Sequence, residues 1–167
     1  MPALLAGLPE SALTEVYESR LKITPGAAAL IDRAHQAGLK VLLVSGGFTF
    51  FTERLKPRLG LDFTRANRLV VAGGKLTGEL DGGIVDADVK RSTVEALCAQ
   101  LGCEPSAAIV VGDGANDLKM MAIAGVSVAY RAKPVVRAQT THALNHCGLD
   151  ALLNCFEDSF GAPVSAP

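Results

Sequence analysis

The sequence predicts an α/β fold: a Rossmann-like parallel sheet with helices on both faces and one small antiparallel hairpin. Apolar residues switch repeatedly between helical spacing and short unbroken runs, which is typical of helices alternating with buried parallel strands. Glycines stand where most of these runs end. With 167 residues, 49% of them apolar and 20% charged, the chain is long enough for one ordinary core and too apolar to be disordered.

The first elements in order are a helix, a strand and a second helix. A hydroxyl cap and a proline at the first helical position predict a helix start at residues 24–26, and Gly38 ends that helix. Residues 41–44 are too few for a helix and apolar on both faces, so they predict an inner parallel strand. The helix that follows buries Phe48, Phe51, Leu55 and Leu59 and is closed by Gly60.

A hairpin is expected next, because residues 69–72 and 75–78 flank a Gly-Gly turn. Further alternation predicts helices at residues 94–101 and 118–125 and strands at residues 108–111 and 126–129. Residues 157–167 contain Gly, Pro and Ser and have little to bury, so we expect an unstructured tail.

Charge and cysteine usage exclude several classes of function. Sixteen basic against seventeen acidic residues give a formal net charge of −1, so we expect neither nucleic acid nor a membrane surface as a partner. No apolar stretch approaches the roughly 18 to 20 residues that cross a bilayer, and no secretory leader is recognisable. The four cysteines form no CxxC pair, which indicates reduced thiols in the cytoplasm.

Ser45, Gly46 and Gly47 follow the first predicted strand, at the edge where parallel α/β sheets bind ligands. A hydroxyl and bare backbone N–H groups ahead of a helix form a cradle for a phosphate oxygen. The alternative is a plain turn in which glycine relieves crowding, and the tripeptide alone does not distinguish the two.

Residues 112–117, Gly-Asp-Gly-Ala-Asn-Asp, follow the second buried strand. The glycines place Asp113 on a tight bend beyond the sheet, with Asn116 and Asp117 in the next helical turn. A carboxylate and an amide near one point suit Mg²⁺, completed by water and a substrate phosphate. A dinucleotide fingerprint is rejected, because Asp117 stands where its third glycine is required. The remaining alternative is that these side chains only cap the helix.

Lys90 lies at the start of another predicted helix, where an isolated lysine is usually solvated. Its significance therefore depends on the other two segments. A zinc module is a third interpretation, but its ligand types lie far apart in the chain and Cys98 falls on an apolar helix face, so a structural role is favoured. The residues concerned are Cys98, Cys103, His142, His146 and Cys147.

The three segments in this order and spacing resemble the haloacid dehalogenase superfamily of phosphatases. The resemblance covers residues 21–156 and is closest to the bacterial phosphoserine phosphatases within that superfamily. It implies Mg²⁺-dependent hydrolysis of O-phosphoserine, a small phosphorylated substrate, to serine and phosphate in cytoplasmic serine biosynthesis. Residues 42–51, 112–121 and 132–134 carry the closest similarity.

The resemblance also implies a role for each residue. The catalytic residues would be Ser45 and Lys90, the substrate and phosphate ligands Ser45, Gly46, Lys90 and Asn116, and the metal ligands Asp113 and, beside it, Asp117. Phosphoryl transfer depends chiefly on positioning and charge stabilisation, and these residue types supply both.

The first motif of the family, Asp-x-Asp-x-Thr, has no counterpart in this sequence. That motif supplies the nucleophile that becomes an aspartyl phosphate and the acid that protonates the leaving group. Asp86 and Asp88 have the D-x-D spacing, but no buried strand precedes them and Lys90 stands where threonine is required. We reject them as nucleophiles and expect no turnover from this chain alone.

By resemblance, residues 1–22 are a remnant of a cap domain, residues 23–156 the core and residues 157–167 a disordered tail. The family's first strand lies between the strands that end at Ser45 and Asp113. Without it, these strands face a gap of roughly 9 to 10 Å, and each unpaired buried backbone group costs about 1 to 3 kcal/mol. We expect the chain to be marginally folded, to pair the two strands, or to take a strand from a partner, self-association included.

Two functions remain open. The first is a phosphoserine phosphatase that is incomplete at its N-terminus, through a gene-model truncation or degradation of the copy. The second is a non-catalytic module that holds a phosphorylated metabolite, or a subunit completed by another chain that carries the first motif. Titration of the chain with phosphate and Mg²⁺ tests the second function, because a binding module should give a saturable signal.

Overall fold

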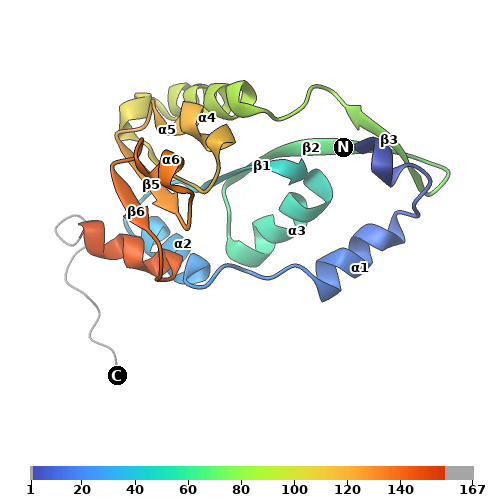
Figure 1. The fold of residues 1–167 in the computed structure, drawn as a ribbon, viewed down its shortest axis with the longest axis horizontal. Coiled ribbons are helices and arrows are strands. Elements are labelled where there is room, and N and C mark those ends of the chain that lie inside the picture. Colours follow the sequence, from blue (N-terminus) through green and yellow to red (C-terminus); the bar gives the residue numbers. More distant parts are fainter. Residues whose placement is uncertain (1, 157–167) are drawn as a thin grey trace.

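The computed structural model describes residues 2–156 (Figure 1). The α/β architecture is confirmed, but its strands form two three-stranded sheets, β1-β2-β3 and β4-β5-β6, instead of one. No described helix is long and apolar enough to span a membrane. The predicted tail at residues 157–167 lies outside the described residues.

The first sheet joins a parallel pair to the predicted hairpin. β1 (Leu42–Phe48) runs parallel to β2 (Phe63–Ala72), and β2 pairs antiparallel with β3 (Lys75–Asp81). Gly73 and Gly74 form the turn with φ values of 58° and 74°, which glycine adopts without strain. β2 begins well before residue 69, where the sequence predicted it, because its first half is rich in polar residues that hide a strand pattern.

The second sheet is entirely parallel. β5 (Val126–Tyr130) lies between β4 (Ile109–Gly112) and β6 (His142–Leu144). Val128 and Ala129 in β5 are 0% exposed, as expected of a strand that is paired on both sides and covered on both faces. β6 was not predicted, because three residues are too few to show a period.

Helices lie on both sides of the strands, with α4 above them and α2 below in Figure 1. Gly60 and Gly102 close α3 and α4 with φ values of 69° and 72°, as predicted. The α-helices are α1 (Ser11–Ser19), α2 (Ala27–Gln36), α3 (Thr49–Leu59), α4 (Ala87–Leu101), α5 (Leu118–Met121) and α6 (Pro134–Arg137). The 3-10 segments are η1 (Pro2–Leu5), η2 (Pro105–Ala107), η3 (Ala115–Asp117) and η4 (Leu149–Phe156).

Three helix predictions need correction. α2 begins at Ala27, and its N-cap is Gly26 with φ 80° and no side-chain cap, so Thr24 does not cap it. α5 is a single turn ending at Met121 rather than a helix to residue 125, and Gly125 lies against the Ser106 carbonyl, where a Cβ would not fit. In α3 only Thr52 is buried. The four apolar residues expected in the core there, Phe48, Phe51, Leu55 and Leu59, are half-buried.

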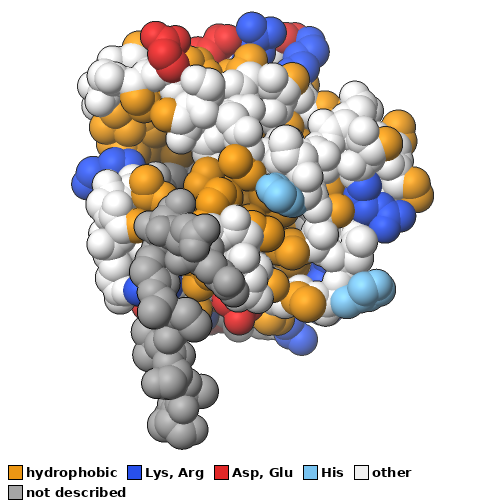
Figure 2. All heavy atoms as spheres, turned by 90° about the vertical axis from the view of Figure 1, so that its left-hand side faces the viewer, with side chains coloured by type: hydrophobic (Ala, Val, Ile, Leu, Met, Phe, Trp, Pro, Cys, Tyr) orange, Lys and Arg blue, Asp and Glu red, His pale blue; other side chains and the backbone are white. Residues whose placement is uncertain are grey.

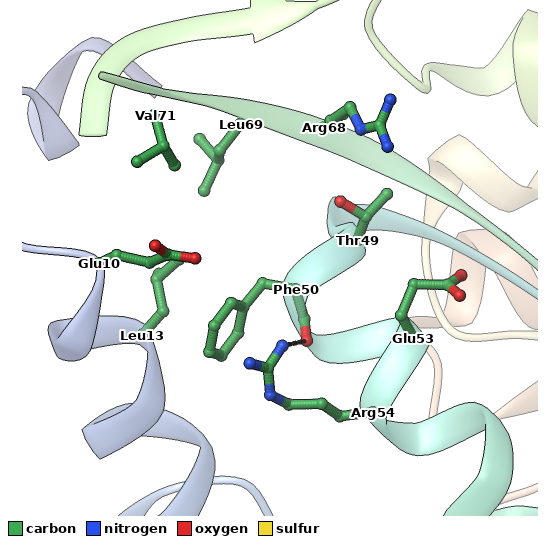
Figure 3. Close-up of a pocket in the computed structure, with 9 residues that line it drawn as sticks. All are labelled: Glu10, Leu13, Thr49, Phe50, Glu53, Arg54, Arg68, Leu69 and Val71. Carbon is green, nitrogen blue, oxygen red and sulfur yellow. Dashed lines mark hydrogen bonds between the residues drawn. The ribbon is translucent and has the colours of Figure 1, made fainter. Parts of the chain in front are cut away.

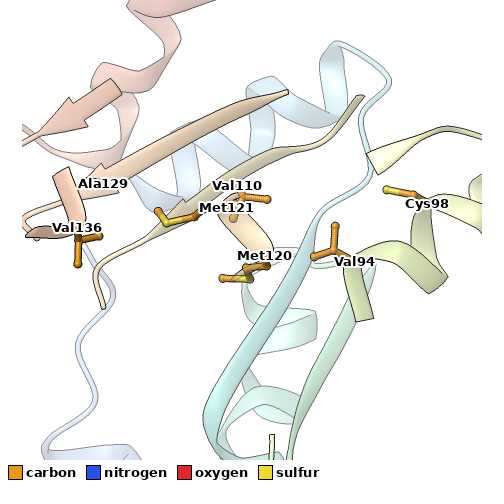
Figure 4. Close-up of a cluster of buried hydrophobic side chains, with 7 residues drawn as sticks. All are labelled: Val94, Cys98, Val110, Met120, Met121, Ala129 and Val136. Carbon is orange, nitrogen blue, oxygen red and sulfur yellow. The ribbon is translucent and has the colours of Figure 1, made fainter. Parts of the chain in front are cut away.

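The main hydrophobic core lies between α4 and the second sheet (Figure 4). Side chains from five elements meet there, which fixes α4 and α5 over β4 and β5. The buried cluster comprises Val94, Cys98, Val110, Met120, Met121, Ala129 and Val136.

Candidate active site

Lys90 lies in the first turn of α4, with its side chain in the interior of the protein. Asp86 is the N-cap, and its carboxylate accepts hydrogen bonds from the N–H groups of Asp88 and Val89 at 3.0 and 2.9 Å. Lys90 Nζ then donates to Asp117 Oδ1 at 2.7 Å, and each side chain is 6% exposed. This low exposure means that Lys90 is not a solvated surface lysine. Asp117 supplies the charged partner that a buried ammonium group requires.

Asp117 links Lys90 to the loop after β4. Its second oxygen, Oδ2, accepts the backbone N–H groups of Asp113 and Gly114, both at 3.1 Å. A Cβ at Gly112 would lie 2.6 Å from the Asp117 Cβ, so a side chain at position 112 would displace this carboxylate. Both Asp117 oxygens are used within the protein, a geometry that favours positioning of Lys90 over metal binding.

Asp113 and Asn116 are the exposed members of the same loop. Within residues 2–156 the Asp113 carboxylate forms no hydrogen bond or ion pair, so its oxygens are available to a hard cation. Asn116 folds back over the loop, so that a Cβ at Gly114 would collide with Asn116 Oδ1. The fit to Mg²⁺ therefore rests on Asp113.

The sequence predicted that the first strand ends at Val44, but β1 continues to Phe48, and residues 45–47 form an irregular stretch within it where the register against β2 shifts. In this stretch, the Ser45 loop, Ser45 is half-buried. Its Oγ accepts the Gly47 N–H at 3.0 Å, so this N–H is committed to the loop itself. The Ser45 hydroxyl keeps its own proton for donation to a ligand.

Asn67 on β2 was missed by the sequence analysis. Its Nδ2 donates to the Gly46 carbonyl and its Oδ1 accepts the Val85 N–H, both at 2.7 Å, and the residue is 5% exposed. A buried asparagine inside a strand is unusual, because this residue type is depleted there, and that was the available signal. Asn67 therefore clamps the Ser45 loop to the segment that enters α4.

These contacts bring the three predicted segments together around the first turn of α4. The Cβ position of Gly46 lies 3.8 Å from the Val85 carbonyl, and Val85 directly precedes the Asp86 cap. Lys90 is one turn further on and binds the 113–117 loop through Asp117. The Ser45 loop, a buried cation and a carboxylate without a partner among residues 2–156 are thus gathered in one region.

Both acids of the D-x-D sequence at residues 86–88 are engaged in structural contacts. Asp86 caps α4, and Asp88 accepts hydrogen bonds from Lys119 Nζ at 2.7 and 2.8 Å. Residues 83–86 form no strand. This geometry agrees with their rejection from sequence.

The residues of the zinc interpretation do not form a cluster in the structure. Cys98 belongs to the buried core, and its burial, together with the hydrogen bond that its S–H donates to Cys103, raises the pKa of its thiol. In the part of the chain that the structure describes, no three His, Cys, Asp or Glu side chains cluster as a metal site.

A separate pocket of about 280 Å³ lies between α1, α3 and β2 (Figure 3). Arg54 contributes to its wall, donating to the Phe50 carbonyl at 2.8 Å and lying 3.5 Å above the Phe50 ring. None of the predicted site residues lines this pocket, so it is not part of the candidate site.

Comparison with known proteins gives relatives over most of the chain. Residues 1–122 match the model of the haloacid dehalogenase-like hydrolase family. A phosphoserine phosphatase of a Polaromonas species is 53% identical over 155 residues, covering 90% of this chain and 66% of that protein. A phosphoserine phosphatase of Archaeoglobus fulgidus is 46% identical over 134 residues, covering 80% of this chain and 39% of that protein.

Solved structures show the same fold. A probable phosphoserine phosphatase from Vibrio cholerae, in unliganded form, superposes with a TM-score of 0.89 at 40% identity, covering 95% of this chain and 49% of that one. A substrate-bound phosphoserine phosphatase complex gives a TM-score of 0.88 at 33% identity, covering 93% of this chain and 74% of that one. The chain therefore matches only part of each of these longer proteins.

Proposed function

The chain belongs to the haloacid dehalogenase-like hydrolase family, and from that membership we propose that its site serves the hydrolysis of O-phosphoserine to serine and phosphate. The observation that carries the proposal is the gathering of the Ser45 loop, buried Lys90 and the 113–117 loop around the first turn of α4. The choice of substrate follows from relatives that are named phosphoserine phosphatases. We place this reaction in serine biosynthesis in the cytoplasm.

In this proposal each residue stabilises or positions the phosphoryl group. Lys90 offsets the negative charge on the phosphoryl oxygens, and the Ser45 hydroxyl and Gly46 N–H donate hydrogen bonds to them. Asn116 contacts the substrate. Asp117 holds Lys90 and the loop in place rather than binding metal.

Asp113 is the residue that would hold Mg²⁺, because its exposed carboxylate has no partner among residues 2–156. When bound, the ion neutralises charge on the phosphate oxygens. With one protein carboxylate, Mg²⁺ binding is expected to depend on phosphate, which supplies further oxygens.

Hydrolysis through a covalent intermediate also needs an attacking carboxylate. Asp86 and Asp88 are both engaged in structural contacts, so we propose that these 167 residues release no phosphate by themselves. The same observation favours a second candidate function, the non-catalytic binding of a phosphorylated metabolite.

The proposal is tested by two measurements on the whole chain. O-Phosphoserine with Mg²⁺ should give no phosphate release above a blank, whereas calorimetric titration with phosphate and Mg²⁺ should show saturable binding. Phosphate release would refute the assignment of Asp86 and Asp88 to structural roles. No saturable heat would refute the phosphate site itself.

Two lysine variants test where phosphate binds. Lys90→Gln should abolish phosphate binding, while Lys119→Gln makes the same charge change at a lysine that is 53% exposed and should leave it intact. Because Lys90→Gln removes a buried charge, Ser45→Ala provides a milder variant that should weaken phosphate binding at least several-fold. Equal binding by all four proteins would place the anion elsewhere.

A further inference from the structure

Two of the cysteines lie together at the C-terminal end of α4. Cys98 is buried, Cys103 is exposed, and both are free thiols. On an uninterrupted α-helix, residues five positions apart point in different directions, because one turn takes about 3.6 residues. The way in which α4 ends therefore decides whether the two sulfur atoms meet.

α4 ends in a turn that brings the two residues back together. Gly102 adopts a φ of 72°, and its N–H donates to the Ala99 carbonyl at 3.2 Å. The Cys103 N–H donates to the Cys98 carbonyl at 2.9 Å. These two bonds form a Schellman motif, in which the side chains of the residues joined by the outer bond frequently pack together. Here those residues are the two cysteines, and the Cys98 S–H donates a hydrogen bond to the Cys103 sulfur.

Both cysteines line a groove of about 670 Å³ between the two sheets. Its side walls are the apolar parts of β1 and β4, and Figure 2 shows hydrophobic side chains gathered across the middle of the molecule. In the part of the chain that the structure describes, β1 pairs only with β2 and β4 only with β5, so the expected pairing of β1 with β4 is wrong. The open groove leaves the Cys103 side chain room to turn toward Cys98.

We propose that Cys98 and Cys103 form a reversible disulfide by exchange with a low-molecular-weight disulfide, such as glutathione disulfide. Their sulfur atoms are already hydrogen-bonded neighbours and need only approach to the disulfide length of about 2.0 Å. The backbone turn that holds them together is in place before the reaction. The pair lies at the opposite end of α4 from Lys90, so the inference does not rest on the proposed function.

The exchange takes two steps. The Cys103 thiolate attacks one sulfur of glutathione disulfide, which forms a mixed disulfide and releases one glutathione thiolate. Cys98 then attacks the Cys103 sulfur, closes the disulfide within the chain and releases the second glutathione thiolate. Each released thiolate takes up a proton that one cysteine has lost. The chain is thus oxidised by loss of two hydrogen atoms, and one glutathione disulfide is reduced to two glutathione molecules.

The different environments of the two thiols set this order. Cys103 is exposed and can meet a dissolved disulfide. Cys98 is 7% exposed, and burial, followed by its hydrogen bond to Cys103, raises the pKa of its thiol. A buried thiol with little thiolate is a poor first nucleophile. It suits the second step, in which the mixed disulfide places a reactive sulfur directly beside it.

The experiment uses the whole chain with Cys147→Ser and Cys155→Ser, because these two exposed thiols would react as well. The folded protein is incubated with glutathione disulfide, quenched with acid and weighed by intact-mass spectrometry. The mass should fall by two hydrogen atoms with no glutathione retained, and dithiothreitol should restore it.

Single-thiol variants in the same background separate the two steps. Cys98→Ala leaves Cys103 without a second thiol, so this variant should retain one glutathione. Cys103→Ser leaves only the buried thiol and should react with glutathione disulfide at least tenfold more slowly. Since Cys103 is exposed, this second variant is compatible with folding.

A comparison with the unfolded chain tests the geometry. At one fixed ratio of reduced to oxidised glutathione, the ratio of disulfide to dithiol should be at least several-fold greater in the folded chain than in concentrated urea. The reason is that the turn at Gly102 holds the two sulfurs together only in the folded state.

Three results would overturn the inference. The first is a glutathione adduct that persists on the chain that has both cysteines. The second is an equal ratio of disulfide to dithiol in the folded chain and in urea. The third is equally fast reaction of Cys103→Ser, which would assign the first step to Cys98. Each result is obtained without phosphate or Mg²⁺, so it leaves the proposed function untouched.

Discussion

β1 and β5 are both short apolar strands, yet the structure gives them opposite environments. β5 lies between β4 and β6, and its three central residues are at most 5% exposed. β1 pairs on one side only, borders the groove on the other, and contains no buried residue. A strand that is apolar on both faces is thus suited to the interior, but its neighbours decide whether it becomes buried.

The two regions also differ in how much their side chains contribute to the free energy of unfolding. Around β5, packed side chains contribute through burial and close contact. Along β1, part of the apolar surface still faces an open groove, so those side chains contribute less. Stability measurements on matched variants therefore test whether the two regions differ as the structure shows.

The largest effect is expected where α4 is tied to the second sheet. Asp117→Ala leaves the Lys90 ammonium buried without its 2.7 Å partner and should reduce the free energy of unfolding by about 3 to 5 kcal/mol, measured by urea denaturation. Asp88→Ala breaks an ion pair whose side chains are 53% and 72% exposed and should cost at most about 1 kcal/mol. Similar losses would contradict the burial of the Lys90 pair.

The direct test of the contrast compares one residue from each region. Met121→Ala removes a side chain that is 2% exposed and should cost about 2 to 5 kcal/mol in urea denaturation. Leu43→Ala on the wall of the groove should cost at most about 1 kcal/mol, because little packing is lost at an open wall. Equal costs would mean that β1 is as closely packed as the second sheet.

A smaller effect is expected at the clamp between β1 and α4. Asn67→Leu leaves the Gly46 carbonyl and the Val85 N–H without the partners they have at 2.7 Å, and should cost about 1 to 3 kcal/mol. It should also weaken phosphate binding measured by calorimetry, since the Ser45 loop is released. Thr77→Val, which breaks a 3.3 Å hydrogen bond in the hairpin, should leave phosphate binding unchanged; parallel losses in both variants would argue against a positioning role.

The smallest effect depends on pH. The Val41 N–H, followed by Lys40 and His35, holds the pKa of the Asp62 carboxyl well below its usual range. A lowered pKa in the folded state stabilises the protein above the ordinary carboxyl pKa of about 4 and loses that contribution as the pH falls below it.

Asp62→Asn tests this contribution. The variant should be less stable than the original chain by about 1 kcal/mol at pH 7, and the difference should shrink between about pH 4 and pH 2. Asp81→Asn alters a carboxylate that is 63% exposed and should show no such trend. A difference in unfolding free energy that stays constant with pH would refute the assignment.

Local sequence was sufficient to place the main elements and to nominate the residues of the candidate site. The positions of β4 and β5, the start of β1, the hairpin turn and the glycines that close α3 and α4 all follow from spacing along the chain. The residue types at Ser45, Lys90 and Asp113 likewise indicated a phosphate and cation site. Each of these features depends on neighbours within a few residues, which the sequence contains directly.

Tertiary structure alone decided which strands pair, which side chains are buried and what each carboxylate contacts. The burial of Lys90 against Asp117 and the clamp by Asn67 join residues that are 18 to 27 positions apart, and the split into two sheets likewise depends on pairing between distant segments. Such contacts depend on which strands lie next to each other in the sheets and on which strand edges remain unpaired. Local periodicity carries no information about either, because a strand has the same pattern whether its neighbour is present or not.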